Sequence, residues 1–347
     1  MKGDKVEIWG VYPPPVGGIS VYCKRLTDLL HGMDSSVMMK NFGSSKSDCA
    51  YVKDVRSPFW ELFRLPFIKR RIIHVQFRDV LFLSALYFAG WKHKIVITLH
   101  NRKMLLQDGW RGRMMRLFLN RVDAIIFNDP SFKELLNTKF GTDIRKMTVL
   151  PTFLPPSESE RRGVTPEIER FCQRYRYTIS SNASILIKNM YGDAYGFDQL
   201  IGMMDILVNR NGMDVGMVFL VSEIGDEKFF EEGVKRIESL GLTERFMILA
   251  GSDVHGYEVW ERTDLFVRAT STDMEGISVK EALLSGTPAI ASDVCIRPSE
   301  AVLYHNGDID ELAGKSLEIL KSGKRVIYKP REDVHLRIMD IYNSIRP

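Results

Sequence analysis

Cysteine and histidine are scarce in this sequence, and neither occurs at the spacing of a metal or disulfide site. The 347 residues include four cysteines and seven histidines, with no CxxC and no HExxH pattern. Zinc sites and disulfide frameworks both depend on such clusters. We therefore expect reduced, mostly buried thiols, as in cytosolic proteins, and no metal site.

Long apolar runs are also missing. The opening residues, MKGDKVEIWGVY, lack the apolar core of a secretory leader. The longest apolar stretch, residues 80–91, has 12 residues, whereas a membrane-spanning helix needs about 20. We interpret this stretch as a buried helix and expect a cytoplasmic protein.

A large net charge is absent as well, but the charges are unevenly distributed. The whole chain carries +4, whereas residues 61–121 contain thirteen Lys or Arg and three Asp or Glu. Segments 59–71 (FWELFRLPFIKRR) and 109–121 (GWRGRMMRLFLNR) mix these cations with aromatic and aliphatic residues. This composition suits an anionic membrane surface, and a solvated basic face is the alternative. No nucleic-acid-binding motif accompanies the cations, so we expect no nucleic acid partner.

Short β-rich runs alternate with amphipathic segments along the whole chain. At about 150 residues per domain, the length predicts two domains. Continuous apolar strands separated by helices indicate parallel sheets covered on both faces, and six strands in each half indicate two doubly wound sheets. The predicted strands are 6–11, 36–39, 72–77, 95–99, 124–127 and 148–150, then 179–187, 215–221, 246–250, 265–267, 288–291 and 301–304.

A proline- and charge-rich stretch at residues 151–162 interrupts both periodicities and marks the domain boundary. We place the first domain at residues 1–155 and the second at 156–330. The amphipathic segment 331–347 is expected to form a helix that packs back on the first domain.

Two glycines, Gly17 and Gly18, follow the first predicted strand and three prolines. They would let backbone N–H groups approach an anion at the start of a helix, where the helix dipole favours negative charge. A tight turn before a helix is the other explanation. Because Gly10 lies too far away for a GxGxxG pattern, a nicotinamide dinucleotide fold is not indicated.

The most informative stretch is residues 268–293, RATSTDMEGISVKEALLSGTPAIASD. Gly276 permits close backbone approach, and Ser278 is expected to cap the helix that starts there. The backbone N–H groups of Gly276, Ile277 and Ser278 would point at a diphosphate. Glu281, one turn into the helix, suits a ribose diol. Asp273 would bind sugar hydroxyls.

Asp273 and Glu281 stand in the D-x7-E register, and the stretch resembles the acid-x7-acid motif of glycosyltransferase family four, a group of retaining GT-B enzymes. PPPVGGISVY, IIHVQF, IVITLHNRK and MTVLPTFLPP are similar to further segments of that family, so the resemblance covers essentially the whole chain. It implies two Rossmann-like domains facing across a cleft. It also implies that the first domain binds the acceptor and the second the nucleotide sugar.

The resemblance further implies transfer of a hexosyl group from a UDP- or GDP-sugar, with retention, to a saccharide or lipid-linked saccharide, in surface polysaccharide or glycolipid synthesis. It implies no metal and no other cofactor. His100 would contact the donor sugar, and His74 is expected to be structural. Where the family has Gly-Arg and Lys-Gly at the diphosphate, this chain has Asn182-Ala183 and Tyr195-Gly196, so Lys188 is the predicted cation.

The catalytic residues predicted in this way are His100, Asp273 and Lys188. We also expect the protein to attach peripherally to the inner face of the cell membrane. The missing Arg and Lys leave another possibility open, a non-catalytic partner subunit that binds nucleotide sugars. A nucleotide-sugar epimerase or a phosphorylase of the same fold is a further alternative.

Overall fold

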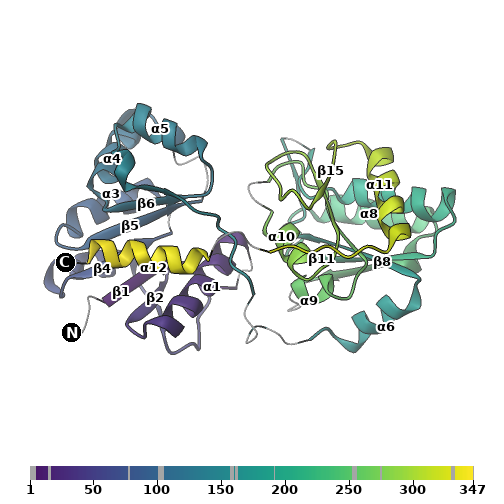
Figure 1. The fold of residues 1–347 in the computed structure, drawn as a ribbon, viewed down its shortest axis with the longest axis horizontal. Coiled ribbons are helices and arrows are strands. Elements are labelled where there is room, and N and C mark those ends of the chain that lie inside the picture. The colour runs from purple at the N-terminus through teal and green to yellow at the C-terminus, as the bar shows by residue number, and fades with distance from the viewer. Residues whose placement is uncertain are drawn as a thin grey trace. The chain divides into compact units, whose positions relative to one another are not determined.

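The computed structural model describes residues 5–346, apart from residues 15–16, 77–78, 101–104, 157–159, 161–162, 191, 252–255, 274–275 and 330–332. The chain forms two compact units, one of residues 1–154 with 331–347 and one of residues 155–330 (Figure 1). Each contains a parallel sheet with helices on both faces. Among the helices described, none is long and apolar enough to cross a bilayer.

The first unit is built on a seven-stranded parallel sheet with the order β3-β2-β1-β4-β5-β6-β7. Its strands are β1 (Lys5–Gly10), β2 (Val37–Asn41), β3 (Val52–Asp54), β4 (Arg71–Val75), β5 (Lys94–Leu99), β6 (Ala124–Phe127) and β7 (Met147–Val149). Six of them lie within two residues of their predicted bounds. The order reverses between β1 and β4, which is where doubly wound sheets bind ligands.

Side chains alternate between the two faces of this sheet because successive residues of a strand point in opposite directions. One face packs against α1 (Gly18–Met33) and α12 (Val334–Ile345), so the C-terminal helix belongs to this unit (Figure 1). The other face packs against further helices. These are α2 (Pro58–Arg64), η1 (Leu65–Phe67), α3 (Val80–Ala89), α4 (Gly109–Arg121) and α5 (Ser131–Phe140), and the short helix η3 (Ile144–Lys146) precedes β7.

Residues Val80–Ala89 form the helix α3, and the expectation of a buried helix holds for one face only. Leu83 and Leu86 pack into the core, whereas Leu81 is 57% and Phe88 66% exposed. The helices α2 and α4 both contact α3.

The second unit is built on a six-stranded parallel sheet with the order β12-β11-β8-β13-β14-β15. Its strands are β8 (Tyr177–Ala183), β11 (Val215–Val221), β12 (Phe246–Ala250), β13 (Leu265–Arg268), β14 (Ala289–Ser292) and β15 (Val302–Tyr304), with a small hairpin of β9 (Lys188–Asn189) and β10 (Gly192–Asp193). The order reverses between β8 and β13. The predicted strand 179–187 ends at Ala183, four residues early.

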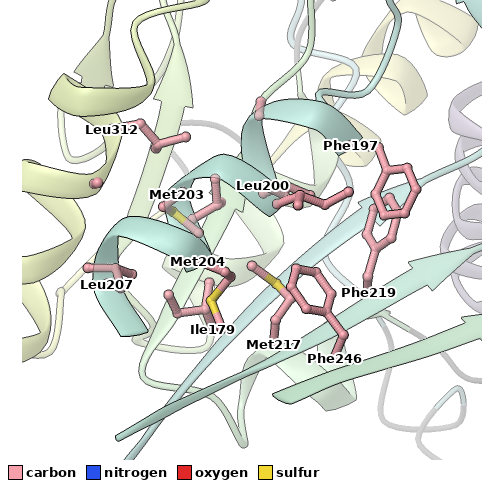
Figure 2. Close-up of a cluster of buried hydrophobic side chains, with 14 of the residues drawn as sticks. Ile179, Phe197, Leu200, Met203, Met204, Leu207, Met217, Phe219, Phe246 and Leu312 are labelled. Carbon is pink, nitrogen blue, oxygen red and sulfur yellow. The ribbon is translucent and has the colours of Figure 1, made fainter. Parts of the chain in front are cut away.

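Two helical layers cover this second sheet. One contains α6 (Pro166–Arg174), α9 (Gly256–Trp260) and α10 (Ile277–Leu284), and the other contains α7 (Phe197–Asp205), η5 (Ile206–Arg210), α8 (Glu227–Ser239) and α11 (Ile309–Ser322), while η6 (Thr243–Arg245) precedes β12. Figure 2 shows the second layer's core, where Phe197 of α7 stacks on Phe219 of β11 with ring centroids 5.3 Å apart. This packing fixes the sheet edge from which the site loops leave.

Candidate functional site

Two arginines and one aspartate form a buried charge cluster at the carboxyl edge of the second sheet. Arg268 ends β13, Asp273 lies in the next loop, and Arg297 lies in the loop after β14. Arg268 Nε and Arg297 Nη1 lie 3.0 and 2.9 Å from the same oxygen of Asp273, Oδ2. Only 1% of the Arg297 side chain is exposed, compared with 11% and 12% for Arg268 and Asp273. We call these residues the arginine–aspartate cluster.

Neutral side chains hold both guanidinium groups in place. Arg268 Nη1 donates a hydrogen bond to Asn182 Oδ1 at 3.1 Å, and the Arg268 guanidinium lies 5.1 Å from the ring centroid of Tyr195. Arg297 Nη2 donates to Thr270 Oγ1 at 3.3 Å. Each guanidinium is therefore fixed by a carboxylate and by at least one polar neighbour, which limits how far it can move.

The cluster carries a net positive charge. Burial by itself raises the pKa of Asp273, but the Arg268 and Arg297 guanidiniums outweigh it and hold that pKa well below its usual range. Asp273 is thus ionised at neutral pH, and these three described side chains by themselves carry one unit of positive charge. Two fixed guanidiniums beside a helix N-terminus are suited to binding an anion.

The N-terminus of α10 lies directly beside this charge. Gly276 is the N-cap residue, with φ of 61° and no side-chain cap. A Cβ on Gly276 would lie 2.2 Å from Arg297 Nη1, so close packing and positive φ both require glycine here. The prediction that Ser278 caps the helix is therefore wrong. Ser278 is instead buried within the first turn, one residue after Ile277.

The first N–H groups of α10 have no acceptor within the helix, and the helix dipole adds to the charge of the two arginines. Glu281 follows in the same helix and is half-buried. Met274 and Glu275 lie outside the described residues. The carboxyl edge of the second sheet thus combines oriented N–H donors, two fixed cations and a carboxylate in one place.

Lys188, the predicted diphosphate cation, has described contacts with the start of α7 and with α8. Its ammonium nitrogen is 4.0 Å from Asp198 Oδ2 and 4.3 Å from the ring centroid of Phe229. About half of its side chain is exposed. In the contacts that the structure shows for described residues, Lys188 pairs with the start of α7 and not with Asp273.

In the first unit, Gly17 and Gly18 begin α1 after the β1 strand. Gly17 is the N-cap, and its N–H donates a hydrogen bond to Ser20 Oγ at 2.9 Å, so the side chain at N3 satisfies the N-cap N–H while the cap itself offers no side chain. A Cβ at Gly17 would meet only Ser20 Oγ, at 4.0 Å, so packing inside the unit does not require glycine there. The loop residues 15–16 immediately before it lie outside the described chain.

A buried hydrogen-bond chain connects His100, after β5, with the C-terminal helix. His100 Nε2 lies 2.6 Å from Gln76 Oε1, Gln76 Nε2 lies 3.0 Å from His74 Nε2, and His74 Nδ1 lies 2.5 Å from the Tyr342 hydroxyl of α12. We call these four residues the histidine chain. The Thr98 hydroxyl also lies 2.7 Å from His74 Nε2.

The histidine chain fixes which ring nitrogens carry protons. Burial lowers the pKa of His74 to about 3, with a smaller effect from His100, so His74 is neutral at physiological pH. An amide NH₂ only donates, so His74 Nε2 accepts from Gln76 and His74 Nδ1 donates to Tyr342. An amide oxygen only accepts, so His100 Nε2 carries a proton. His74 is structural, as predicted.

The first unit matches a known sequence family. Residues 16–158 match the model described as Glycosyltransferase Family 4. This range covers most of the first unit. Over these residues the first unit is similar to glycosyltransferase family 4. No curated protein matches the sequence significantly.

Solved structures extend the likeness in fold to both units. HepE of Anabaena, solved with UDP, is 14% identical, and the match covers 98% of this chain and 100% of HepE with a TM-score of 0.67. Sucrose-phosphate synthase of Thermosynechococcus elongatus is 16% identical over 99% of both chains, with a TM-score of 0.67. A glycosyltransferase of Rickettsia africae is 14% identical over 99% of this chain and 98% of its own, with a TM-score of 0.69. These matches confirm the predicted GT-B fold.

Arg268 and Arg297 of this glycosyltransferase were not among the residues predicted from the sequence. Arg268 carried a local signal, because a charged residue ends an otherwise apolar strand at the carboxyl edge of a sheet. Arg297 carried none, since it reaches Asp273 from a loop 24 residues later. Tyr195 stands where the family's lysine is expected, and the structure places the Arg268 guanidinium over its ring.

The four cysteines are all free, as predicted. Cys23 is fully buried, whereas Cys49, Cys172 and Cys295 are partly buried. Burial raises the pKa of Cys23 to about 12, which keeps this thiol protonated and unreactive. Within the described residues, no three His, Cys, Asp or Glu side chains gather as a metal site would require.

His74 predicts a pH dependence of stability. Its pKa is about 6.5 when unfolded and about 3 when folded, so the unfolded chain binds one more proton between these values. The stabilisation that depends on neutral His74 is fully present above pH 6.5. Below that value the free energy of unfolding falls by about 1.4 kcal/mol per pH unit.

Urea unfolding at pH 7.5, 6.0 and 5.0 measures this slope of unfolding free energy against pH. His74→Asn should flatten it and His335→Asn, on the same C-terminal helix as Tyr342, should not. Equal slopes for wild type and His74→Asn would contradict the assignment.

Proposed function

We propose that this glycosyltransferase is a retaining, metal-independent enzyme that transfers a hexosyl group from a UDP- or GDP-sugar to a saccharide, free or lipid-linked. The observation that carries the proposal is the pair of buried arginines beside the N-terminus of α10, with Asp273 and Glu281 close in sequence. Such a site offers what a nucleotide diphosphate needs: fixed cations, oriented N–H donors and carboxylates for hydroxyl groups. HepE, which shares the fold, has been solved with UDP and with UDP-glucose.

In this proposal the diphosphate lies against Arg268, Arg297 and the N–H groups of residues 276–278. Glu281 accepts hydrogen bonds from the ribose hydroxyls. Asp273 holds the two guanidiniums in place and also accepts from a hydroxyl of the transferred sugar. The role first predicted for Lys188 passes to Arg268 and Arg297, because these cations are bound to Asp273 and Lys188 is not.

Chemistry in this site depends mainly on stabilising the leaving group. The bond between the anomeric carbon and the diphosphate oxygen breaks, the acceptor oxygen bonds to that carbon, and the acceptor proton passes to the departing phosphate oxygen. Negative charge grows on the diphosphate, so pre-oriented cations and N–H donors lower the barrier. From the first unit we propose that His100 contacts the transferred sugar and that the loop of Gly17 and Gly18 approaches the donor phosphate.

Surface polysaccharide or glycolipid synthesis on the cytoplasmic side of the membrane is the setting we propose for this reaction. A lipid-linked acceptor would place the growing saccharide at a membrane surface. No further cofactor is needed by this chemistry, because the donor already carries the activated sugar and its leaving group.

A thermal-shift screen tests the donor. Wild-type protein is heated with UDP-glucose, UDP-galactose, UDP-N-acetylglucosamine and GDP-mannose, each with and without EDTA. A donor at 100 times its Kd stabilises the folded state by about 2.7 kcal/mol and raises the Tm. We expect one base to be preferred, with no loss of the shift in EDTA. A loss of the shift in EDTA would contradict metal independence.

Transfer assays with the selected donor then separate enzyme from binding protein. NMR of the product should show the donor's anomeric configuration, as retention requires. Donor binding without transfer to any member of a broad saccharide panel would favour the non-catalytic partner subunit. Absence of any shift would contradict the proposed donor site.

A further inference from the structure

Seven large aromatic side chains among the described residues of the first unit are exposed, although such residues are normally buried. Trp110 lies on α4, and the other six come from α2, from η1, from the last turn of α3 and from the residues just after it. The exposed fractions of these six range from 63% to 81%. We call these six the aromatic ridge: Phe59, Trp60, Phe63, Phe67, Phe88 and Trp91.

Three rings of the ridge contact one another, and the segments that carry the others lie against the same turn. Trp60 stacks on Phe63 with ring centroids 5.6 Å apart, and Phe63 lies 5.8 Å from Phe67. Lys92 Nζ donates a hydrogen bond to the Pro66 carbonyl at 2.7 Å, which ties Trp91, the neighbour of Lys92, to the η1 turn. The helices α2 and α3 also contact each other directly. A run of apolar surface this long is unusual on a monomer and marks an interaction site.

The charges around the ridge have one sign. Lys69 and Arg70 are exposed next to Phe67, and Lys92 follows Trp91. Residues 57–94 contain two acids, Glu61 and Asp79. Glu61 is buried against Lys40, 3.1 Å away, and Asp79 caps α3 by accepting from the Leu81 N–H. The flank of the ridge is therefore basic, and its partner should be anionic.

We propose that the aromatic ridge inserts into the interfacial region of an anionic lipid membrane, with Lys69, Arg70 and Lys92 against the lipid headgroups. Tryptophan and phenylalanine beside lysine and arginine match the layered polarity of that interface, where rings lie at headgroup depth. A protein partner is less consistent, because protein interface cores are depleted of lysine. This inference does not rest on the proposed transfer reaction, and its test uses neither donor nor acceptor.

Vesicle flotation tests the proposal with the full-length protein. Vesicles of phosphatidylcholine with 30% phosphatidylglycerol, and of phosphatidylcholine alone, are compared at about 50 and 150 mM salt. We expect binding to the anionic vesicles, weaker at higher salt, and little binding to the neutral ones. Tryptophan fluorescence should shift to the blue on binding and be quenched by brominated lipid.

Two variants assign the binding to the ridge. Trp60→Ala/Phe63→Ala/Phe67→Ala should lower the partition coefficient at least tenfold, and Lys69→Gln/Arg70→Gln should reduce it mainly at low salt. A matched control, Ile296→Ala/Ile327→Ala, removes two exposed apolar side chains of the second unit and should bind as wild type. Because all these residues are exposed, the Tm should not change.

Three results would overturn the proposal. The first is no flotation at either salt concentration, and the second is an unchanged partition coefficient in the ridge variant. The third is a wild-type protein that self-associates through the ridge, seen as a dimer by size-exclusion chromatography that the ridge variant converts to monomer. Loss of transfer activity with normal flotation would instead count against the proposed function alone.

Discussion

Arg297→Met is expected to lower kcat/KM for sugar transfer by about 100- to 1,000-fold, the effect of removing one pre-oriented donor to a developing oxyanion. The Arg297 side chain is 1% exposed and ends 2.9 Å from Asp273 and beside Gly276. Methionine fills a similar volume and leaves Arg268 paired with Asp273, so the cluster becomes neutral rather than unpaired. Arg268→Met should act in the same way.

A matched control is Arg245→Met, which breaks a 3.2 Å ion pair with Asp214 at the amino edge of the same sheet. This variant should keep its transfer rate and its affinity for UDP, because the amino edge lies away from α10. The measurement is steady-state transfer together with UDP affinity by calorimetry. Unchanged UDP affinity in both Arg268→Met and Arg297→Met would show that the cluster is structural.

Asp273→Asn separates the roles within the cluster. It leaves two buried guanidiniums without their carboxylate, and breaking a buried ion pair in this way destabilises a protein by about 3–5 kcal/mol. The low pKa of Asp273 also means that its ionised form stabilises the folded protein. This stabilisation is fully present above about pH 3.9, the pKa of an unfolded aspartate, and is lost as the pH falls below that value. Arg297→Met should therefore lose activity with little loss of stability, and Asp273→Asn should lose both.

Gln76→Leu is expected to reduce kcat about 100-fold, because it disconnects His100 from His74 while His100 itself remains. Gln76 is 4% exposed and bridges the two imidazoles by contacts of 2.6 and 3.0 Å. Without it, the His100 ring loses the acceptor that fixes its orientation and its protonated nitrogen. Misplacement of a reacting group by about 1 Å costs about this factor.

The kinetic signature distinguishes positioning from folding. In Gln76→Leu, kcat should fall with the donor KM nearly unchanged, because the Gln76 amide oxygen no longer orients the His100 ring. Tyr342→Phe, at the far end of the histidine chain, should show a smaller effect of the same kind. Gln173→Leu, on the exposed face of α6, is the control. A lower Tm in Gln76→Leu with wild-type kcat would refute the positioning role.

The replacement of the family's cations explains how a departure from a motif can keep its chemistry. Tyr195 occupies the position expected for a lysine, yet its ring lies under the Arg268 guanidinium, and Asn182 accepts a hydrogen bond from the same group. We propose that Arg268 and Arg297 supply the positive charge that the family's Arg and Lys would supply. Lys188, predicted from the missing motif, pairs with Asp198 in the structure and stays a second candidate.

Secondary structure was predictable where neighbouring residues determine it. The strands β6, β11 and β12 have their predicted bounds because each is a short apolar run between polar turns. The prediction for β8 ran on to residue 187 because Ile185 and Ile187 are apolar. In the structure both pack around Gly225, beyond the end of the strand. The strand β3 was missed because only Val52 of its three residues is buried.

By itself, the sequence determined two parallel α/β sheets and the acid-x7-acid spacing of Asp273 and Glu281 on either side of Gly276. These features depend on spacing within a few residues, which periodicity and backbone conformation record directly. Only the tertiary structure decided which cations meet Asp273 and which residues hold His100. Tyr342 reaches His74 across 268 positions of sequence, and Asn182 reaches Arg268 across 86. Contacts of this kind exist only after the sheets form and bring their carboxyl edges and covering helices together, so no local pattern encodes them.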